Sequence, residues 1–190
     1  MEGLLNVFTA FGLSTSAGLN AYLPLLLVAL LARFTDLISL EPPWNVLESW
    51  WVIGVLAVLL IVELLVDKVP AVDTVNDTIQ TFVRPAAGAI LFASSAGVIS
   101  DASPVLALIC GLLISGGVHA AKATARPVVT GATAGTLNPV VSTLEDVVSL
   151  VLTILAILVP LLALLLLAVV IIWFIRWRRR RREQWSHADW

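Results

Sequence analysis

Four acidic side chains between residues 63 and 77 have the spacing of helical neighbours. Glu63 and Asp67 are four residues apart, as are Asp73 and Asp77, and residues at that spacing share one face of an α-helix. Two carboxylates on one face repel each other, which favours uptake of a proton or of a hard cation such as Mg²⁺ or Ca²⁺. Glu63 follows a long uncharged run, so it is the strongest candidate for a charge inside a membrane.

The same acids also have a simpler explanation. The insert that carries Asp73 and Asp77 is polar enough to lie at a surface, where both side chains would be solvated. We favour that explanation for these two residues. For Glu63 we expect an ion pair with Lys68 or Arg84, the nearest basic residues along the chain.

A second group of candidates follows a glycine-rich apolar run. His119 precedes Lys122 and Arg126 by three and seven residues, which places all three on roughly one helix face. A histidine titrates near neutral pH and could relay protons. The group resembles a small anion pocket as much as basic side chains that reach toward the membrane interface. No second histidine, cysteine or close carboxylate has metal-ligand spacing from His119, so a zinc site is not supported.

Two apolar segments, residues 14–24 and 130–139, are interrupted by small residues, a Leu-Asn pair and a nearby proline. In lipid a broken helix is tolerated only where its free backbone groups meet protein or a wet cavity. Paired broken segments in the two halves of a membrane protein point to a solute site. We therefore expect Asn20 and Asn138 to line such a site. Hydrogen bonding between helices is an alternative of nearly equal weight.

A further acidic pair, Glu145 and Asp146, follows the second break. Direct neighbours on a helix point in different directions, which makes a shared site less favoured. One of them could instead cap the start of the last helix, where the helix dipole favours negative charge. Both residues stay candidates for binding a substrate or an ion.

Two Arg-Pro pairs also occur in similar sequence contexts. Arg84-Pro85 and Arg126-Pro127 both precede small or β-branched residues. Proline at the first position of a helix costs little, because its missing N–H would have no partner there. Both pairs therefore predict helix starts. With the paired breaks they suggest an internal repeat of two related halves, parallel or inverted, although ordinary basic helix ends explain them equally well.

The elements that must position these residues have membrane composition. Hydrophobic residues make up 59% of the 190-residue chain and charged residues 13%, against about 45–50% and 25% in soluble domains. We expect an all-α polytopic membrane protein with five or six membrane segments, including broken or re-entrant helices. Residues 1–175 would form one transmembrane domain and residues 176–190 a cytoplasmic tail. The expected segments are residues 3–33, 50–66, 86–100, 104–121 and 143–175, the last with a break near Pro160 if there are six.

The basic residues are concentrated at the C-terminus. Arg176 and Arg178 through Arg182 are six of the eleven basic residues. Such a run after an apolar helix marks the cytoplasmic side and suits anionic lipid headgroups better than nucleic acid. We expect a multi-pass protein of the plasma (inner) membrane with its C-terminus in the cytoplasm, while the side of the N-terminus stays open. The single cysteine, Cys110, excludes an intrachain disulfide.

These observations favour a transporter or channel for an ion or small solute, with its site at a broken helix near the membrane midplane. The chain has no nucleophile elbow, no zinc-protease motif and no phosphate loop, so an enzyme is less favoured. The alternatives are an assembly factor that binds a partner membrane protein, and an intramembrane lipid-modifying enzyme. No cofactor is evident apart from a cation. We expect a homo-oligomer in the bilayer.

Several strings resemble an uncharacterised bacterial integral-membrane family, domain of unknown function 4126. The resemblance covers roughly residues 5–160 and leaves the arginine-rich tail outside. It implies the membrane fold and the choice of residues, and it implies no activity. The matching strings are Gly18-Leu19-Asn20-Ala21-Tyr22-Leu23-Pro24, Glu63-x-x-x-Asp67-Lys68-x-Pro70-x-x-Asp73, Arg84-Pro85-Ala-Ala-Gly88 and Thr133-Ala-Gly-Thr-Leu-Asn138-Pro139-Val-Val-Ser142-x-x-Glu145-Asp146.

Overall fold

The computed structural model describes residues 2–67, 70–95 and 103–159, without the side chains of residues 2, 4 and 70–75. The expectations for Lys68, for the Asp73 side chain and for the tail therefore lie outside the described residues. So do the ends of two expected segments, residues 96–100 and 160–175. The chain divides into one unit of Met1–Ile157 and another of Leu158–Trp190. The packing given below is that of the first unit.

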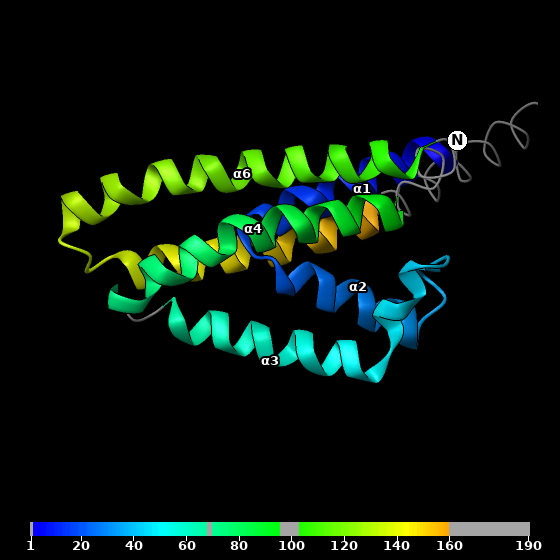
Figure 1. Cartoon of the computed structure of the whole chain (residues 1–190), viewed down its shortest axis with the longest axis horizontal. Helices are drawn as coiled ribbons and strands as arrows, with labels where there is room; N and C mark the ends of the chain where they lie inside the picture. Colours follow the sequence, from blue (N-terminus) through cyan, green and yellow to red (C-terminus); the bar gives the residue numbers. More distant parts are fainter. Residues whose placement is uncertain (1, 68–69, 96–102, 160–190) are drawn as a thin grey trace, which may run out of the picture. The chain divides into compact units, whose positions relative to one another are not determined.

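Every regular element in the described residues is a helix, as expected for an all-α protein (Figure 1). The final helix carries no label and follows α6 directly. The elements are α1 (Glu2–Leu19), α2 (Tyr22–Phe34), the 3₁₀ helix η1 (Trp44–Glu48), α3 (Trp50–Val66), α4 (Pro70–Ser95), α6 (Pro104–Thr133) and the helix Asn138–Val159.

Helices α1 and α6 run in one direction, and α4 and the helix Asn138–Val159 run in the opposite direction (Figure 1). Small residues allow the helices to approach closely. The Ser14 hydroxyl donates to the Gly88 carbonyl oxygen at 2.9 Å, and Ser16 Oγ lies 2.7 Å from Thr153 Oγ1. Such small and hydroxyl side chains are the usual means of holding helices together in lipid. These contacts place the end of α1 inside the bundle.

The first predicted break is a reversal of the chain within the bundle. Helix α1 has 18 residues and α2 has 13, and the two are separated only by Asn20 and Ala21. A Cβ on Gly18, near the end of α1, would lie 2.7 Å from the Ser115 carbonyl oxygen, about midway along α6. Helix α2 then runs back toward the end where α1 began (Figure 1). Residues 3–33 therefore form a helical hairpin of α1 and α2 instead of one interrupted helix.

The two prolines predicted to start helices lie inside helices. Pro85 is within α4 and Pro127 is within α6, so both predicted helix starts are wrong. The polar insert and the first part of the 86–100 segment form one continuous helix, and the segment expected to end at residue 121 continues to Thr133. A surface position for the whole insert is wrong, because Gln80 is buried and Asn76 and Asp77 are half-buried.

Much of the exposed surface is apolar, while several charged side chains lie inside. Trp51 is 86% exposed, Phe82 77% and Val128 72%, whereas Arg84 is 0% and Glu63 1% exposed. Soluble proteins show the opposite distribution. Helices Pro104–Thr133 and Asn138–Val159 are long and apolar enough to cross a membrane. Only 22% of the apolar window of each is buried, so neither has the burial of a core helix in a soluble protein.

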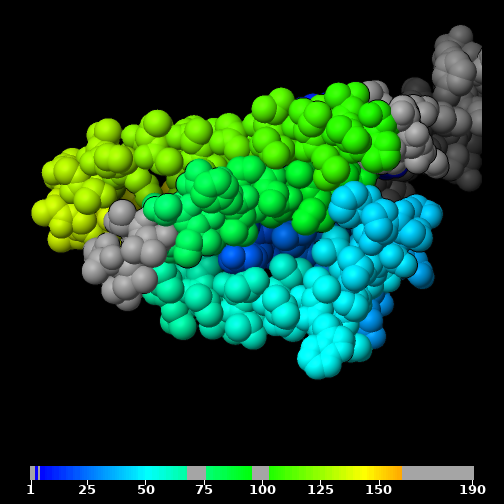
Figure 2. Space-filling model, viewed as in Figure 1, coloured from blue at the N-terminus to red at the C-terminus, as the bar shows by residue number. Residues whose placement is uncertain are grey.

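Helix α3 and η1 stand partly apart from α4. Figure 2 shows a hollow between α3 and α4, through which atoms of the blue N-terminal segment are visible. Helix α2 lies between α3 and α4 in Figure 1, and α3 packs along it, where Phe34 meets Trp50 edge to face. Contacts between α3 and α4 are therefore concentrated at a few side chains, which belong to the candidate site.

Two glycines on α6 allow a matched test of this packing. A Cβ on Gly111 would lie 2.6 Å from Phe92 Cβ and 2.7 Å from Ala89 Cα, whereas one on Gly117 would meet nothing within 4 Å. Gly111→Ala is expected to cost about 1–3 kcal/mol through overpacking. Gly117→Ala should be neutral or stabilise by up to about 1 kcal/mol. Thermal unfolding in detergent measures both, and equal effects would contradict the close approach of α4 and α6.

Candidate functional site

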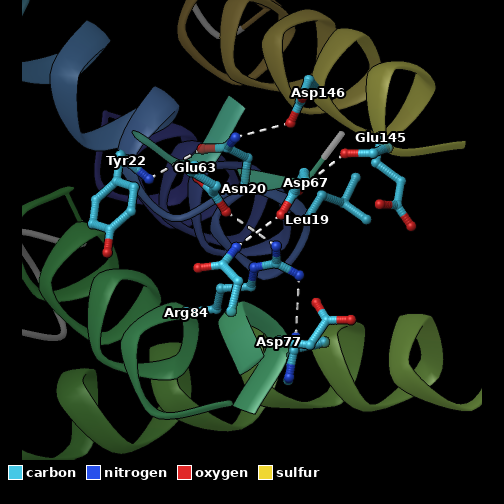
Figure 3. Close-up of polar contacts among 12 residues, drawn as sticks. Leu19, Asn20, Tyr22, Glu63, Asp67, Asp77, Arg84, Glu145 and Asp146 are labelled. Atoms are coloured by element: carbon cyan, nitrogen blue, oxygen red, sulfur yellow. Dashed lines mark hydrogen bonds and ion pairs between the residues drawn. The ribbon is translucent and has the colours of Figure 1, made fainter. Parts of the chain in front are cut away.

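A buried ion pair joins α3 to α4. Arg84 Nη2 lies 3.0 Å from Glu63 Oε1, and the side chains are 0% and 1% exposed. Figure 3 shows the two groups facing each other, with Asn20 and Asp67 nearby. Charged side chains persist in such an interior only when they are paired. The predicted pairing of Glu63 with Arg84 is therefore present in the structure.

His119 extends this pair toward α6. Thr81 Oγ1 donates to the backbone oxygen of Asp77 at 2.9 Å, so at 3.1 Å it accepts from His119 Nε2. Nδ1 of the same ring then accepts from Arg84 Nη1 at 3.3 Å, because arginine can only donate. These contacts assign His119 as a neutral ring with its proton on Nε2.

Asp67 ends α3 among residues from three other helices. Its Oδ1 accepts from Asn76 Nδ2 at 2.8 Å and its Oδ2 from the Ser142 hydroxyl at 3.0 Å. Arg126 Nη2 lies 3.9 Å from Oδ2. Asp67 and Glu63 share a helix face as predicted, but each carboxylate has its own partners.

Lys122 and Arg126 bring α6 into the same group of charges. Lys122 Nζ lies 2.7 Å from Glu145 Oε2 and donates to the carbonyl oxygen of Leu19, the last residue of α1, at 3.3 Å. Arg126 contacts Asp77 Oδ2 at 2.9 Å and Glu145 Oε2 at 3.3 Å. Both cations therefore have carboxylate partners in the structure.

Asn20 holds the tip of the α1–α2 hairpin. Its Oδ1 accepts the backbone N–H groups of Tyr22 and Leu23 at 3.1 and 2.9 Å, and its Nδ2 donates to Asp146 Oδ1 at 2.9 Å. The amide therefore satisfies the free donors at the start of α2, as a capping residue does. This local bonding explains why α2 can begin inside the bundle.

We call these neighbouring side chains the polar network. Its members come from α3, α4, α6, the final helix and the hairpin tip. They are Asn20, Glu63, Asp67, Asp77, Arg84, His119, Lys122, Arg126, Glu145 and Asp146.

A groove of about 930 Å³ leads to this network. Its lining includes Asp77, Thr81, His119 and Arg126, and its outer part is formed by Thr130, Gly131 and Asn138 among others. Because Thr130 and Gly131 are exposed while His119 is 4% exposed, the groove connects the surface with the buried charges. Its volume is within the range of small-molecule sites.

Asn20 and Asn138, which we expected to line one site, lie in different environments in the structure. Asn20 is buried at the hairpin tip, while Asn138 accepts an exposed hydrogen bond from Thr130 at 3.1 Å. The second break lies beyond the end of α6, where Ala134 and Gly135 adopt positive φ angles of 49° and 78°. Asn138 therefore belongs to the groove, and the two breaks are not equivalent.

Glu145 and Asp146 do point in different directions, as predicted, yet both reach the polar network. Neither caps the final helix, because that helix begins at Asn138 and the pair lies about two turns inside it. Asp77, for which we favoured a solvated position, is half-buried against Arg126.

Thr81, Gln80 and Ser142 contribute polar groups that sequence reasoning missed. The sequence of the final helix does contain a pattern that predicts a polar face and that includes Ser142. Ser142, Asp146, Ser149 and Thr153 repeat at intervals of three or four residues, which defines one polar stripe on an otherwise apolar helix. Among the described residues, no three His, Cys, Asp or Glu side chains converge as a metal site would require.

A family model described as Domain of unknown function (DUF4126) matches residues 7–180. The chain belongs to this family. The match confirms the resemblance and extends further than expected, into the arginine-rich tail of the DUF4126 chain. No curated protein matches this chain, and no solved structure does so either.

Replacing each asparagine tests whether the breaks of this DUF4126 protein differ as described. Asn20→Ala removes the cap of α2 and leaves Asp146 without its donor, so it should cost at least about 1–2 kcal/mol. Asn138→Ala loses only an exposed hydrogen bond and should change stability little. Thermal unfolding of both variants in detergent is the measurement. A larger loss for Asn138→Ala would show that the second break, and not the first, has the structural role.

Proposed function

We propose that this DUF4126 protein is a multi-pass protein of the plasma membrane that carries a small ion across the bilayer, as a transporter or channel. The moving species would be a cation, because acidic side chains outnumber basic ones among the network residues named above. The observation that carries the proposal is the groove, which reaches a buried charge network in a bundle with an apolar exterior.

The cost of burying charge supports this function. Ionisable side chains within membrane segments are rare, face the bundle interior and commonly mark ion or proton pathways. Glu63, Arg84 and Lys122 satisfy that description, since each is buried and each has a partner of opposite charge. A protein with no function in its interior could use apolar packing at these positions at no loss of stability.

The hairpin tip supports the same function. Broken helices at mid-depth expose helix ends whose partial charges bind ions. Here the end of α1 presents the Leu19 carbonyl oxygen to Lys122, and the start of α2 meets Asn20. Both helix ends therefore lie beside the charged network, as in a transport site.

Flux measurements on the purified full-length chain in liposomes test the proposal. Wild type should move at least one of H⁺, Na⁺, K⁺ or a small organic cation. Gly131→Phe should lower the rate several-fold, because it places a ring in the groove, where a Cβ meets no atom within 4 Å. Gly117→Phe is the matched control, since Gly117 is equally open, lies on the same helix and does not line the groove.

A structural role without transport is the second candidate. It is favoured by the pairing of Arg84, Lys122 and Arg126 with carboxylates, which would also hold a bundle together. A folded wild type that moves none of the tested ions would decide for this role. Equal flux in the two phenylalanine variants would show that the groove is not the path.

A further inference from the structure

The polar network has fewer positive than negative groups. In the described part of the chain it contains five carboxylates and three basic side chains, while the contacts of His119 assign it as neutral. Unbalanced negative charge is costly in a low-dielectric interior. The network therefore favours the addition of positive charge. The carboxylates are Glu63, Asp67, Asp77, Glu145 and Asp146.

Atoms without a hydrogen-bond partner indicate where that charge is needed. Among buried side-chain atoms in the described residues, four lack a partner: the oxygens Glu63 Oε2, Asp77 Oδ1 and Gln80 Oε1, and the donor Arg84 Nε. A buried acceptor without a donor is costly. The Asp77 side chain lines the groove and is 26% exposed, although its Oδ1 atom is itself buried. Glu63 and Gln80 are each 1% exposed, so their donor must come from inside the protein.

We propose that the ion bound by this site is a proton and that it attaches to Glu63 Oε2. This inference rests on the proposed transport function and names its ion. A proton needs one oxygen, whereas a hard cation such as Ca²⁺ needs six or more. No suitable group of three His, Cys, Asp or Glu side chains exists in the described residues. Glu63 offers one unpartnered oxygen, which fits a proton.

Proton binding would change the partner of Arg84. The new Oε2–H bond neutralises the Glu63 carboxylate, and the hydroxyl becomes a donor. Arg84 Nη2 then loses its ion pair, and Gln80 Oε1, one turn earlier on α4, is an acceptor within its reach. When the proton leaves Oε2, Arg84 returns to Glu63 Oε1. One proton thus makes and breaks the main link between α3 and α4.

The groups around Glu63 come from every helix packed against it. Arg84 faces it from α4 and Lys122 acts on it from α6, while Asp67 lies one turn further along α3. Tyr22 approaches from α2 and contacts Gln80. The groove approaches the pair through His119, which contacts Arg84. A proton from the groove therefore has a short way to the carboxylate.

Infrared difference spectroscopy of the full-length chain in lipid tests proton binding directly, because a protonated carboxyl group has a C=O band that a carboxylate lacks. Acidification should produce a band in wild type that is missing in Glu63→Gln. The band should remain in Glu41→Gln, whose side chain is exposed. In liposomes under an imposed K⁺ diffusion potential, proton uptake should be lost in Glu63→Gln. It should be slowed in Gln80→Leu, which keeps the band.

The outcomes separate this inference from the function on which it rests. Movement of Na⁺, K⁺ or another solute, with the same carboxyl bands in wild type and Glu63→Gln, would overturn the proton assignment and leave the proposed function intact. A Glu63 band without movement of any ion would contradict the proposed function, and with it the role of the proton as cargo. A folded Glu63→Gln variant with normal proton uptake would also overturn the assignment.

Discussion

Arg84→Leu is expected to lower the free energy of unfolding by about 3–5 kcal/mol, because it leaves the Glu63 carboxylate buried without its cation. The Arg84 side chain is 0% exposed and bonds both Glu63 and His119. Its removal therefore also leaves His119 Nδ1 without a donor. Thermal or denaturant unfolding in detergent micelles measures the loss. This should be the largest effect of any single substitution considered for this chain.

The double variant Glu63→Leu/Arg84→Leu separates pairing from packing. Replacement of a whole buried ion pair by apolar residues is often neutral or stabilising, so the double variant should lose less stability than Arg84→Leu alone. Arg33→Leu is a control, because that exposed guanidinium lies over the Trp50 ring and its loss should cost on the order of 1 kcal/mol or less. Additive losses in the double variant would contradict a coupled pair.

Arg126→Gln is expected to have the second largest effect, a loss of about 3 kcal/mol. The guanidinium lies 2.9 Å from Asp77, 3.3 Å from Glu145 and 3.9 Å from Asp67, so its removal leaves three carboxylates close together with less neutralising charge. Arg126→Lys keeps the charge and loses the planar fork, which should give an intermediate loss. The same unfolding assay measures all variants.

A second substitution tests the cause of that loss. If Arg126 acts by neutralising Asp77, then Asp77→Asn in the Arg126→Gln background should restore part of the lost stability, because it removes one of the repelling charges. Asp36→Asn, which changes an exposed carboxylate in the loop after α2, should restore none. If Asp77→Asn lowers stability further in that background, Asp77 is held by groups other than Arg126.

The charged residues of the site could be predicted from the sequence because burial of charge in apolar segments is so restricted. Glu63 interrupts an apolar run, and the nearest basic residues along the chain are few. Its partner was therefore one of two residues, Lys68 or Arg84. Helical spacing also predicts that His119, Lys122 and Arg126 share one face.

Which helix each face meets could not be predicted. Spacing shows that Lys122 and Arg126 share a face, but only the fold shows that this face meets Asp77 of α4 and Glu145 of the final helix. Because the sequence does not show which helix this face meets, it predicts either an anion pocket or contact with the membrane interface for Lys122 and Arg126. The polar insert was placed at the surface by the same error, since a polar stretch can also face a polar interior.

The sequence predicts only in part where each helix break lies along the bundle. The strings around Asn20 and Asn138 are similar, so they predict two breaks without placing either in depth. Segment length does distinguish them. The helices on both sides of Asn20 have 18 and 13 residues, whereas α6 and the final helix have 30 and 22. The close approach of Gly18 to Ser115, about midway along α6, is what places the first break within the bundle, and only the fold shows it.

The hairpin also has a topological consequence. In the proposed membrane arrangement α1 and α2 enter and leave on the same side, so the N-terminus shares a side with the acidic loop of residues 35–49 (Figure 1). Cytoplasmic loops are enriched in lysine and arginine, which that loop lacks. An epitope at the N-terminus should therefore be accessible from outside the cell.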